Sequence, residues 1–325
     1  SASNNSYWPE MYENMSIVEN APHLPYSYDL HKPSRFGMAT SQDPNLIMSP
    51  LELANCIFNK KNIKKYSPIT MANWFNEYAN KARTNLLKAI KKIKNKNDPE
   101  FLRLEIDINI LIGIGKFFSY KIKSACYWEL YIKEKKFNLG YQSLQLYKKS
   151  YSAWSKIAKI SKKFYLEDLT YGPQSWLRGR WDDRLPAIKD DIVKMTNILD
   201  ENLIKSKKHI NIFELSRSNN NQSFHINHTI EKKSDTSVDI TINNLNKING
   251  ELFFNYRQVN QAKKWQRNKI RSIKNRFTIM KFNNFLKQNY PIQYYFELVE
   301  KKYSYFCPGI NKNLSNQPYY VYDNI

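Results

Sequence analysis

The sequence predicts an α+β protein of several domains: an irregular strap, then an all-α helical bundle, then a small all-β sandwich. Two observations support this prediction. Apolar residues recur at three- and four-residue spacing through the middle of the chain, which is typical of amphipathic helices. After residue 209 the period changes to the alternation expected of half-buried strands. We place the three parts at residues 1–48, 49–210 and 211–325.

The first part contains too many prolines for a long helix. Pro9, Pro22, Pro25, Pro33 and Pro44 interrupt it, and aromatic residues are scattered between them. We expect so aromatic a segment to lie against another surface, either as a strap or as the last segment of an upstream barrel. The chain opens on Ser rather than Met, and we expect it to be a piece of a longer polypeptide.

Capping residues followed by proline mark the starts of three helices. Ser49-Pro50, Ser67-Pro68 and Asp98-Pro99 each place a side-chain acceptor before a proline at the first helical position. Two further helices are predicted over 139–164 and 184–208. Five helices with short connections indicate an antiparallel bundle.

The third helix, predicted over 101–135, is the longest. Its expected core-facing residues are Leu104, Ile108, Leu111, Ile112, Phe118, Ile122, Ala125 and Leu130. Gly113 and Gly115 weaken it intrinsically, so we expect a neighbouring helix to approach closely there.

Six alternating segments predict the sandwich, and Asn, Gly, Lys and Pro clusters separate them. They are residues 223–230, 237–242, 251–256, 277–282, 292–298 and 319–322. Their alternating aromatic residues fit the core of a sandwich better than an outward-facing carbohydrate platform, although both arrangements occur.

The formal net charge of +22 indicates a polyanion partner when it is taken alone. However, lysine supplies most of the excess and is spread along the whole chain, whereas phosphate recognition favours clustered arginine. Composition therefore argues against a nucleic-acid partner. No stretch has the roughly 20 apolar residues of a membrane span. Cysteine and histidine spacing predicts neither a metal site nor a disulfide, and no cofactor motif is present.

The segment of residues 165–188 has the most informative composition. It combines Trp176 and Trp181 with Arg178, Arg180 and Asp182 between two helical regions. Rings that stack on apolar sugar faces, interleaved with groups that hydrogen-bond hydroxyls, are typical of a carbohydrate-binding surface. The alternative is a structural loop in which the arginines of the segment pair with its own carboxylates.

The opening segment holds secondary candidates of the same kind. Glu10 lies beside Trp8 and Tyr12, but glycosidic cleavage needs two carboxylates that face each other across the bond. Glu10 takes part in such a site only if upstream sequence supplies the rest, and a plain surface glutamate is the alternative.

Four anchors together resemble the C-terminal part of large bacterial glycoside-hydrolase-like proteins. They are residues 7–15 (YWPEMYENM), 65–68 (KYSP), 177–188 (LRGRWDDRLPAI), and 256–261 (YRQVNQ) with the closing 316–319 (NQPY). The resemblance implies a catalytic barrel, a helical domain and a β-sandwich, a layout similar to that of α-glucuronidases. It also implies that the catalytic acid and base lie mostly upstream of this chain.

The expected role is therefore to support a carbohydrate-active barrel and to contribute to its substrate cleft, with carbohydrate as the partner. The sequence leaves open a homodimer, catalysis by the parent protein, and export of that parent. The competing function is a basic binding module for nucleic acid or another polyanion.

Overall fold

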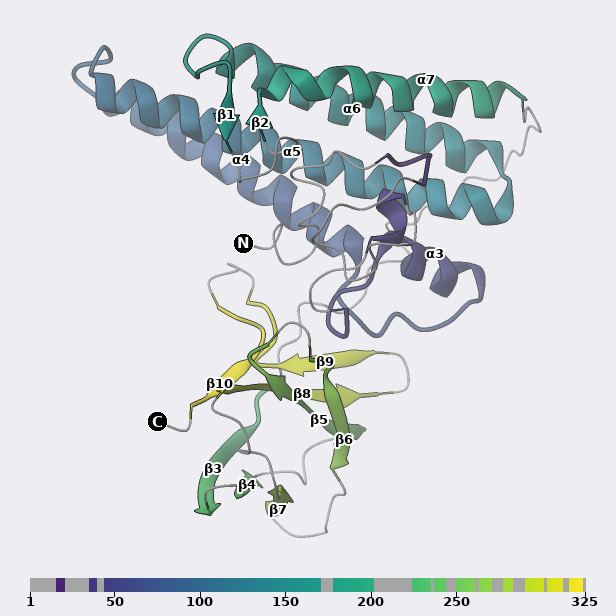
Figure 1. The fold of residues 1–325 in the computed structure, drawn as a ribbon, viewed down its shortest axis with the longest axis vertical. Coiled ribbons are helices and arrows are strands. Elements are labelled where there is room, and N and C mark those ends of the chain that lie inside the picture. Colours follow the sequence, from purple (N-terminus) through teal and green to yellow (C-terminus); the bar gives the residue numbers. More distant parts are fainter. Residues whose placement is uncertain are drawn as a thin grey trace. The chain divides into compact units, whose positions relative to one another are not determined.

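The computed structural model describes residues 16–20, 35–39, 44–170, 178–201, 224–234, 237–243, 250–260, 263–270, 277–282, 290–300, 303–311 and 316–323. The chain forms two compact units (Figure 1). The helical unit comprises Ser1–Lys61 and Tyr66–Arg217, and the β unit comprises Asn62–Lys65 and Ser218–Ile325. The predicted fold class, helices followed by a small antiparallel β region, is confirmed. The domain boundaries stay a prediction.

The described part of the helical unit has five α-helices and two short 3₁₀ helices, of which η1 precedes the α-helices and η3 (Trp181–Arg184) lies between α6 and α7. The other helices are η1 (Phe36–Met38), α3 (Pro50–Phe58), α4 (Pro68–Lys92), α5 (Pro99–Glu134), α6 (Phe137–Ser161) and α7 (Leu185–Glu201). All three predicted starts are confirmed, with Ser49, Ser67 and Asp98 each accepting a hydrogen bond from a first-turn backbone N–H. Each such cap contributes about 1 kcal/mol to helix stability.

Helix α5 is the central element and packs between α4 and α6 (Figure 1). From Phe117 onward it is buried on nearly all sides. Two of its predicted core residues are wrong, since Leu104 and Leu111 are 55% and 65% exposed. Each lies one position before a residue on the side of α5 between α4 and α6, namely Glu105 and Ile112. Because successive residues of a helix are about 100° apart around its axis, Leu104 and Leu111 point away from that side.

The expected close approach at the α5 glycines is confirmed. A Cβ atom on Gly113 would lie 2.4 Å from Cγ1 of Ile157 on α6, and one on Gly115 would lie 3.2 Å from Ala79 on α4. Glycine is therefore required at the first position because the neighbouring helix occupies the space of a side chain.

Buried charges on the helices hold the described pieces of the strap. Arg35 forms a bidentate ion pair with Glu129 of α5, in which Nε and Nη2 each donate to one carboxylate oxygen at 2.7 Å. The side chain of Glu129 is 1% exposed. Asp191 of α7, 4% exposed, accepts hydrogen bonds from the Ser16 hydroxyl and the Ile17 N–H. The described pieces of the strap are thus held by polar contacts as well as by the buried ring of Phe36.

The β unit consists of two antiparallel sheets around one core. One sheet has the order β10-β8-β5-β6 with β9 also beside β8, and the other has the order β3-β4-β7. The strands are β3 (Asn227–Ser234), β4 (Ser237–Asn243), β5 (Glu251–Gln258), β6 (Gln266–Ile270), β7 (Phe277–Phe282), β8 (Ile292–Val299), β9 (Ser304–Cys307) and β10 (Tyr320–Tyr322). Both sheets contribute to the core, for example Ile240 of β4 and Phe254 and Phe296 of β5 and β8.

Two strands of the β unit were not predicted. In β6 only Ile270 is buried, because the strand lies at the sheet edge, so its sequence shows no apolar alternation. Strand β9 has only four residues. Among the described residues, no helix is long and apolar enough to cross a membrane.

Candidate functional site

The segment of residues 165–188 forms a short hairpin and a turn of 3₁₀ helix on the helical unit. Strands β1 (Leu169–Thr170) and β2 (Arg178–Gly179) pair antiparallel, and η3 (Trp181–Arg184) then leads into α7. Trp176 lies outside the described residues, as do Trp8, Glu10 and Tyr12, and only the backbone of Arg178 is described. Three candidates can therefore be placed: Arg180, Trp181 and Asp182.

Arg180 forms hydrogen bonds with carboxylates of the same segment. Its Nε and Nη2 donate to the two carboxylate oxygens of Asp182 at 2.9 and 2.8 Å, and its Nη1 donates to Glu167 at 3.0 Å. Asp183 accepts from the Arg180 backbone N–H at 2.6 Å, next to Gly179 with its left-handed φ of +119°. The hydrogen bond to Asp182 raises the pKa of the guanidinium, so Arg180 is a permanent cation.

The two partners of Arg180 differ sharply in exposure. The side chain of Asp182 is 25% exposed and that of Arg180 is 22% exposed, whereas Glu167 is 91% exposed. The bidentate pair with Asp182 fixes the direction of the guanidinium fork. The pair with Glu167 is a surface contact of small free energy, which a competing anion can displace.

Trp181 is positioned by α6 and by Tyr165. Its carbonyl accepts a hydrogen bond from the Trp154 Nε1 at 2.6 Å, and its half-buried ring makes a T-shaped contact with Tyr165 at 5.1 Å. The Tyr165 hydroxyl in turn donates to Asp107 of α5. Burial, assisted by that hydrogen bond, raises the pKa of Tyr165 to about 12.

The placed candidates thus form one contiguous cluster with Glu167 and Tyr165, two residues that were not among the candidates. The loop alternative is also realised in part, because Arg180 pairs within its own segment. These hydrogen bonds use three of the five N–H groups of the guanidinium, so a carboxylate or vicinal hydroxyls can bind Arg180 by taking the place of Glu167. The described residues contain no cluster of three metal-ligating side chains.

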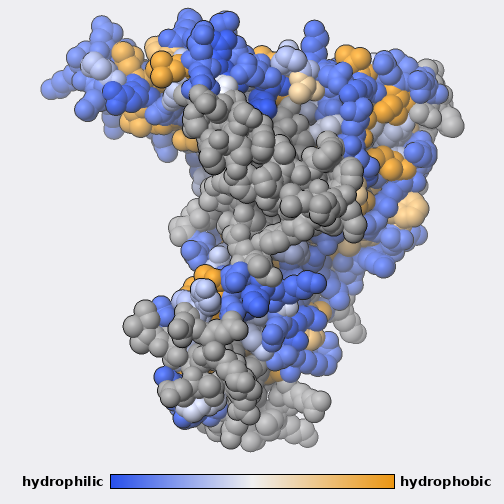
Figure 2. Space-filling model, in the orientation of Figure 1, coloured by the Kyte–Doolittle hydropathy of each residue, from blue (hydrophilic) through white to orange (hydrophobic). Residues whose placement is uncertain are grey.

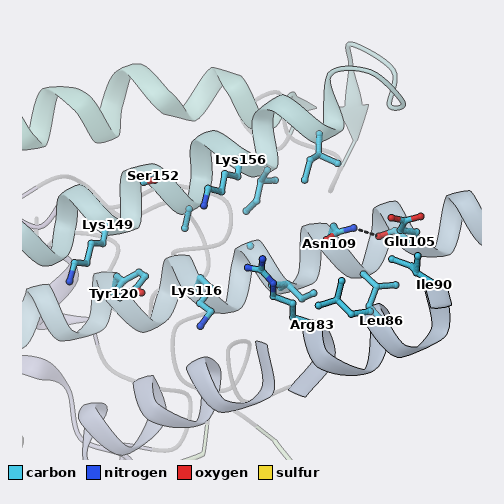
Figure 3. Close-up of a pocket in the computed structure, with 16 residues that line it drawn as sticks. Arg83, Leu86, Ile90, Glu105, Asn109, Lys116, Tyr120, Lys149, Ser152 and Lys156 are labelled. Carbon is cyan, nitrogen blue, oxygen red and sulfur yellow. Dashed lines mark hydrogen bonds between the residues drawn. The ribbon is translucent and has the colours of Figure 1, made fainter. Parts of the chain in front are cut away.

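A second feature, which sequence reasoning missed, is a groove of about 630 Å³ between α4, α5 and α6. Figure 3 shows α5 along its floor, with Arg83 and Leu86 of α4 on one side and Lys149 and Lys156 of α6 on the other. The lysines recur at helical spacing in the sequence. Which helix faces meet, however, is decided by packing between segments that are distant in the chain.

Of the aromatic residues that the sequence singled out in the β unit, those that the structure describes are buried or half-buried except Tyr290, which is 56% exposed. Phe254, Tyr294 and Phe296 lie in the core, which confirms the preferred interpretation. Tyr295 points to the opposite face but is 1% exposed, with a T-shaped contact to Trp265 at 4.9 Å.

Comparison with known proteins gives little more. No family model and no curated protein matches the chain. One solved structure with partial similarity is described as a GH138 enzyme targeting pectin rhamnogalacturonan II. It shares 20% identity at a TM-score of 0.42, over 47% of this chain and 23% of that one. So loose a superposition carries no argument about function.

Proposed function

We propose that this chain is the helical and β-sandwich region of a carbohydrate-active, glycoside-hydrolase-like protein. In this role it supports a catalytic barrel supplied by the longer parent and contributes part of the substrate cleft. The single observation behind the contribution to the cleft is the state of Arg180. Asp182 holds its guanidinium in a fixed direction, and the other partner, Glu167, is almost fully exposed.

The chemistry follows from those contacts. A sugar carboxylate has the same shape and charge as the Glu167 side chain, so it can replace that side chain on Nη1 of Arg180 without disturbing the pair with Asp182. Trp181 adds apolar area beside the guanidinium, and tryptophan rings bind the C–H faces of sugars. Because the cluster is already ordered, little side-chain entropy is lost on binding. The preferred ligand class is therefore an acidic sugar, such as a uronate.

Glu167→Gln separates this function from a purely structural role. Removal of the competing charge is expected to increase the affinity for galacturonate or glucuronate oligosaccharides several-fold, and Arg180→Ala is expected to abolish binding. Glu77→Gln is the matched control, because Glu77 forms an equally simple exposed pair with Lys81 on α4. Titration calorimetry on the full chain measures all three variants.

A structural loop predicts a different pattern. In that case no variant changes sugar affinity, and Arg180→Ala only lowers the free energy of unfolding. In the parent protein, unchanged turnover and sugar affinity after alanine replacement of Trp176 and Trp181 would reduce these two residues to structural ones.

A further inference from the structure

The groove between α4, α5 and α6 has an aliphatic floor and basic walls. Leu86, Ile112 and Ile157 are buried along it, while Ile90 and Ile160 are half-buried. Leu87 on the α4 wall is 52% exposed. Arg83, Lys149 and Lys156 stand exposed on the walls, and Lys116 lies half-buried on the floor.

The described lining of the groove carries a net positive charge. Of the described residues that line it, four are cationic, namely Arg83, Lys116, Lys149 and Lys156, and one, Glu105, is a carboxylate. The Lys116 Nζ donates to the neutral side chains of Asn76 and Asn80 at 2.6 and 2.5 Å rather than to an acid. Burial, and secondarily the nearby Arg83, lowers the pKa of Lys116. An anionic ligand would relieve the repulsion between Lys116 and Arg83.

A small apolar cluster packs between α4 and α5 beside the groove. Its buried residues are Ala79, Leu86 and Ile112, with Ala82, Ile90 and Ile108 partly buried around them. Figure 1 shows α4 and α5 continuing as an antiparallel pair beyond the β1–β2 hairpin, and Figure 2 shows hydrophobic atoms among the hydrophilic ones at that end. The end of the bundle therefore leaves apolar surface that a further helix would bury.

The dimensions of the groove match one helix. Its floor runs along α5 from Glu105 to Tyr120, a length of roughly 22 Å or about four helical turns. Lys149 and Lys156 are seven residues apart on one wall, about 10 Å along α6. Carboxylates at positions i and i+7 of a helix lying in the groove would meet both lysines.

We propose that this groove docks an acidic amphipathic helix of a partner protein. The apolar stripe of the partner lies on the aliphatic floor, and its Glu or Asp residues face Arg83, Lys149 and Lys156. Tyr120 is the only aromatic residue that lines the groove within the described part of the chain. Single-stranded nucleic acids and sugars stack on aromatic rings, so the floor suits neither. A second copy of this chain, with its charge of +22, would be repelled.

The proposal is independent of the carbohydrate function, because none of the described residues that line the groove belongs to the segment of residues 165–188. The test uses the full chain and a labelled synthetic helix of about four turns with a leucine stripe flanked by glutamates at i and i+7. Fluorescence anisotropy is expected to show saturable binding. A peptide of the same composition in scrambled order, and one with lysine in place of glutamate, are expected not to bind.

Charge reversal on α6 locates the site. Lys149→Glu/Lys156→Glu is expected to weaken peptide binding by at least about tenfold. The control Lys148→Glu/Lys159→Glu changes the net charge equally on exposed α6 positions that do not line the groove, and should stay within about twofold. Leu87→Asn is expected to weaken binding, whereas Val193→Asn, at 48% exposure on α7, is not.

Three results would overturn the proposal. The first is the absence of binding to the wild-type chain, and the second is an equal loss in the two charge-reversal doubles. The third is tighter binding of a single-stranded oligonucleotide or polygalacturonate that the groove double abolishes, since this assigns the groove to another class of ligand.

Discussion

The ion pair between Arg35 and Glu129 should be one of the most sensitive points of the helical unit. Arg35→Met removes two charge-assisted hydrogen bonds of 2.7 Å and leaves a carboxylate that is 1% exposed without its cation. An uncompensated buried charge of this kind costs about 3–5 kcal/mol of unfolding free energy. The double variant Arg35→Met/Glu129→Met removes both charges and should cost clearly less, because apolar groups of similar size then fill the site.

Urea denaturation followed by helical circular dichroism measures both variants, since all described helices belong to the helical unit. Hydrogen exchange at the Phe36 amide, which donates to the Ser16 carbonyl at 2.8 Å, reports the strap directly. Arg103→Met, an exposed position on α5, is the control and should change the unfolding free energy by no more than about 0.5 kcal/mol. The reasoning fails if Arg35→Met costs under about 1 kcal/mol, or if the double variant is the less stable of the two.

Three further predictions concern packing and protonation. Gly113→Ala should destabilise the helical unit by about 1–3 kcal/mol, although alanine has the better helix propensity, because the new Cβ meets Ile157. The loss of unfolding free energy should be smaller in an Ile157→Ala background. If the free-energy losses of the two substitutions simply add, the contact is contradicted. Burial lowers the pKa of His228, so the unfolded state takes up the proton first as pH falls, and the β unit should lose stability below about pH 6.5. The melting temperatures of wild type and His228→Phe should therefore diverge in this range. Melting temperatures that fall in parallel would show that His228 does not cause the loss. The pKa of Tyr165 is raised to about 12, so the stability that its proton provides is complete below about pH 10 and is lost as pH rises from 10 to 12. The pKa values of Tyr256, Tyr294 and Tyr320 are raised too, so phenolate absorbance should show several late-titrating tyrosines, and Tyr165→Phe should remove one of them.

The helix starts were predictable because capping is local. The side chain of Ser49 and the backbone N–H that it satisfies are three residues apart, so the sequence contains the whole interaction. The alternation in β5 and β8 was equally readable, since both strands contribute every second residue to one core. Strand β6 was not predicted, because an edge strand with one buried residue shows no alternation of apolar and polar residues.

For the candidate site, the sequence predicted which residue types are present but not most of their contacts. The sequence shows that Arg180 lies among acids, and its pairing with Asp182 spans only two residues. That Glu167 is its exposed second partner, and that Tyr165 reaches Asp107 on α5, depends on how the hairpin folds onto the bundle.

The sequence by itself therefore determined the helices, most of the strands, the order of the two structural classes and the segment richest in binding chemistry. These depend on periodicity and on contacts within a few residues. Only the tertiary structure decided which side of α5 is buried, that Arg35 reaches Glu129, and that basic side chains of three helices border one groove. Such contacts join residues that are dozens of positions apart, and helix packing rather than local propensity sets the distances between them.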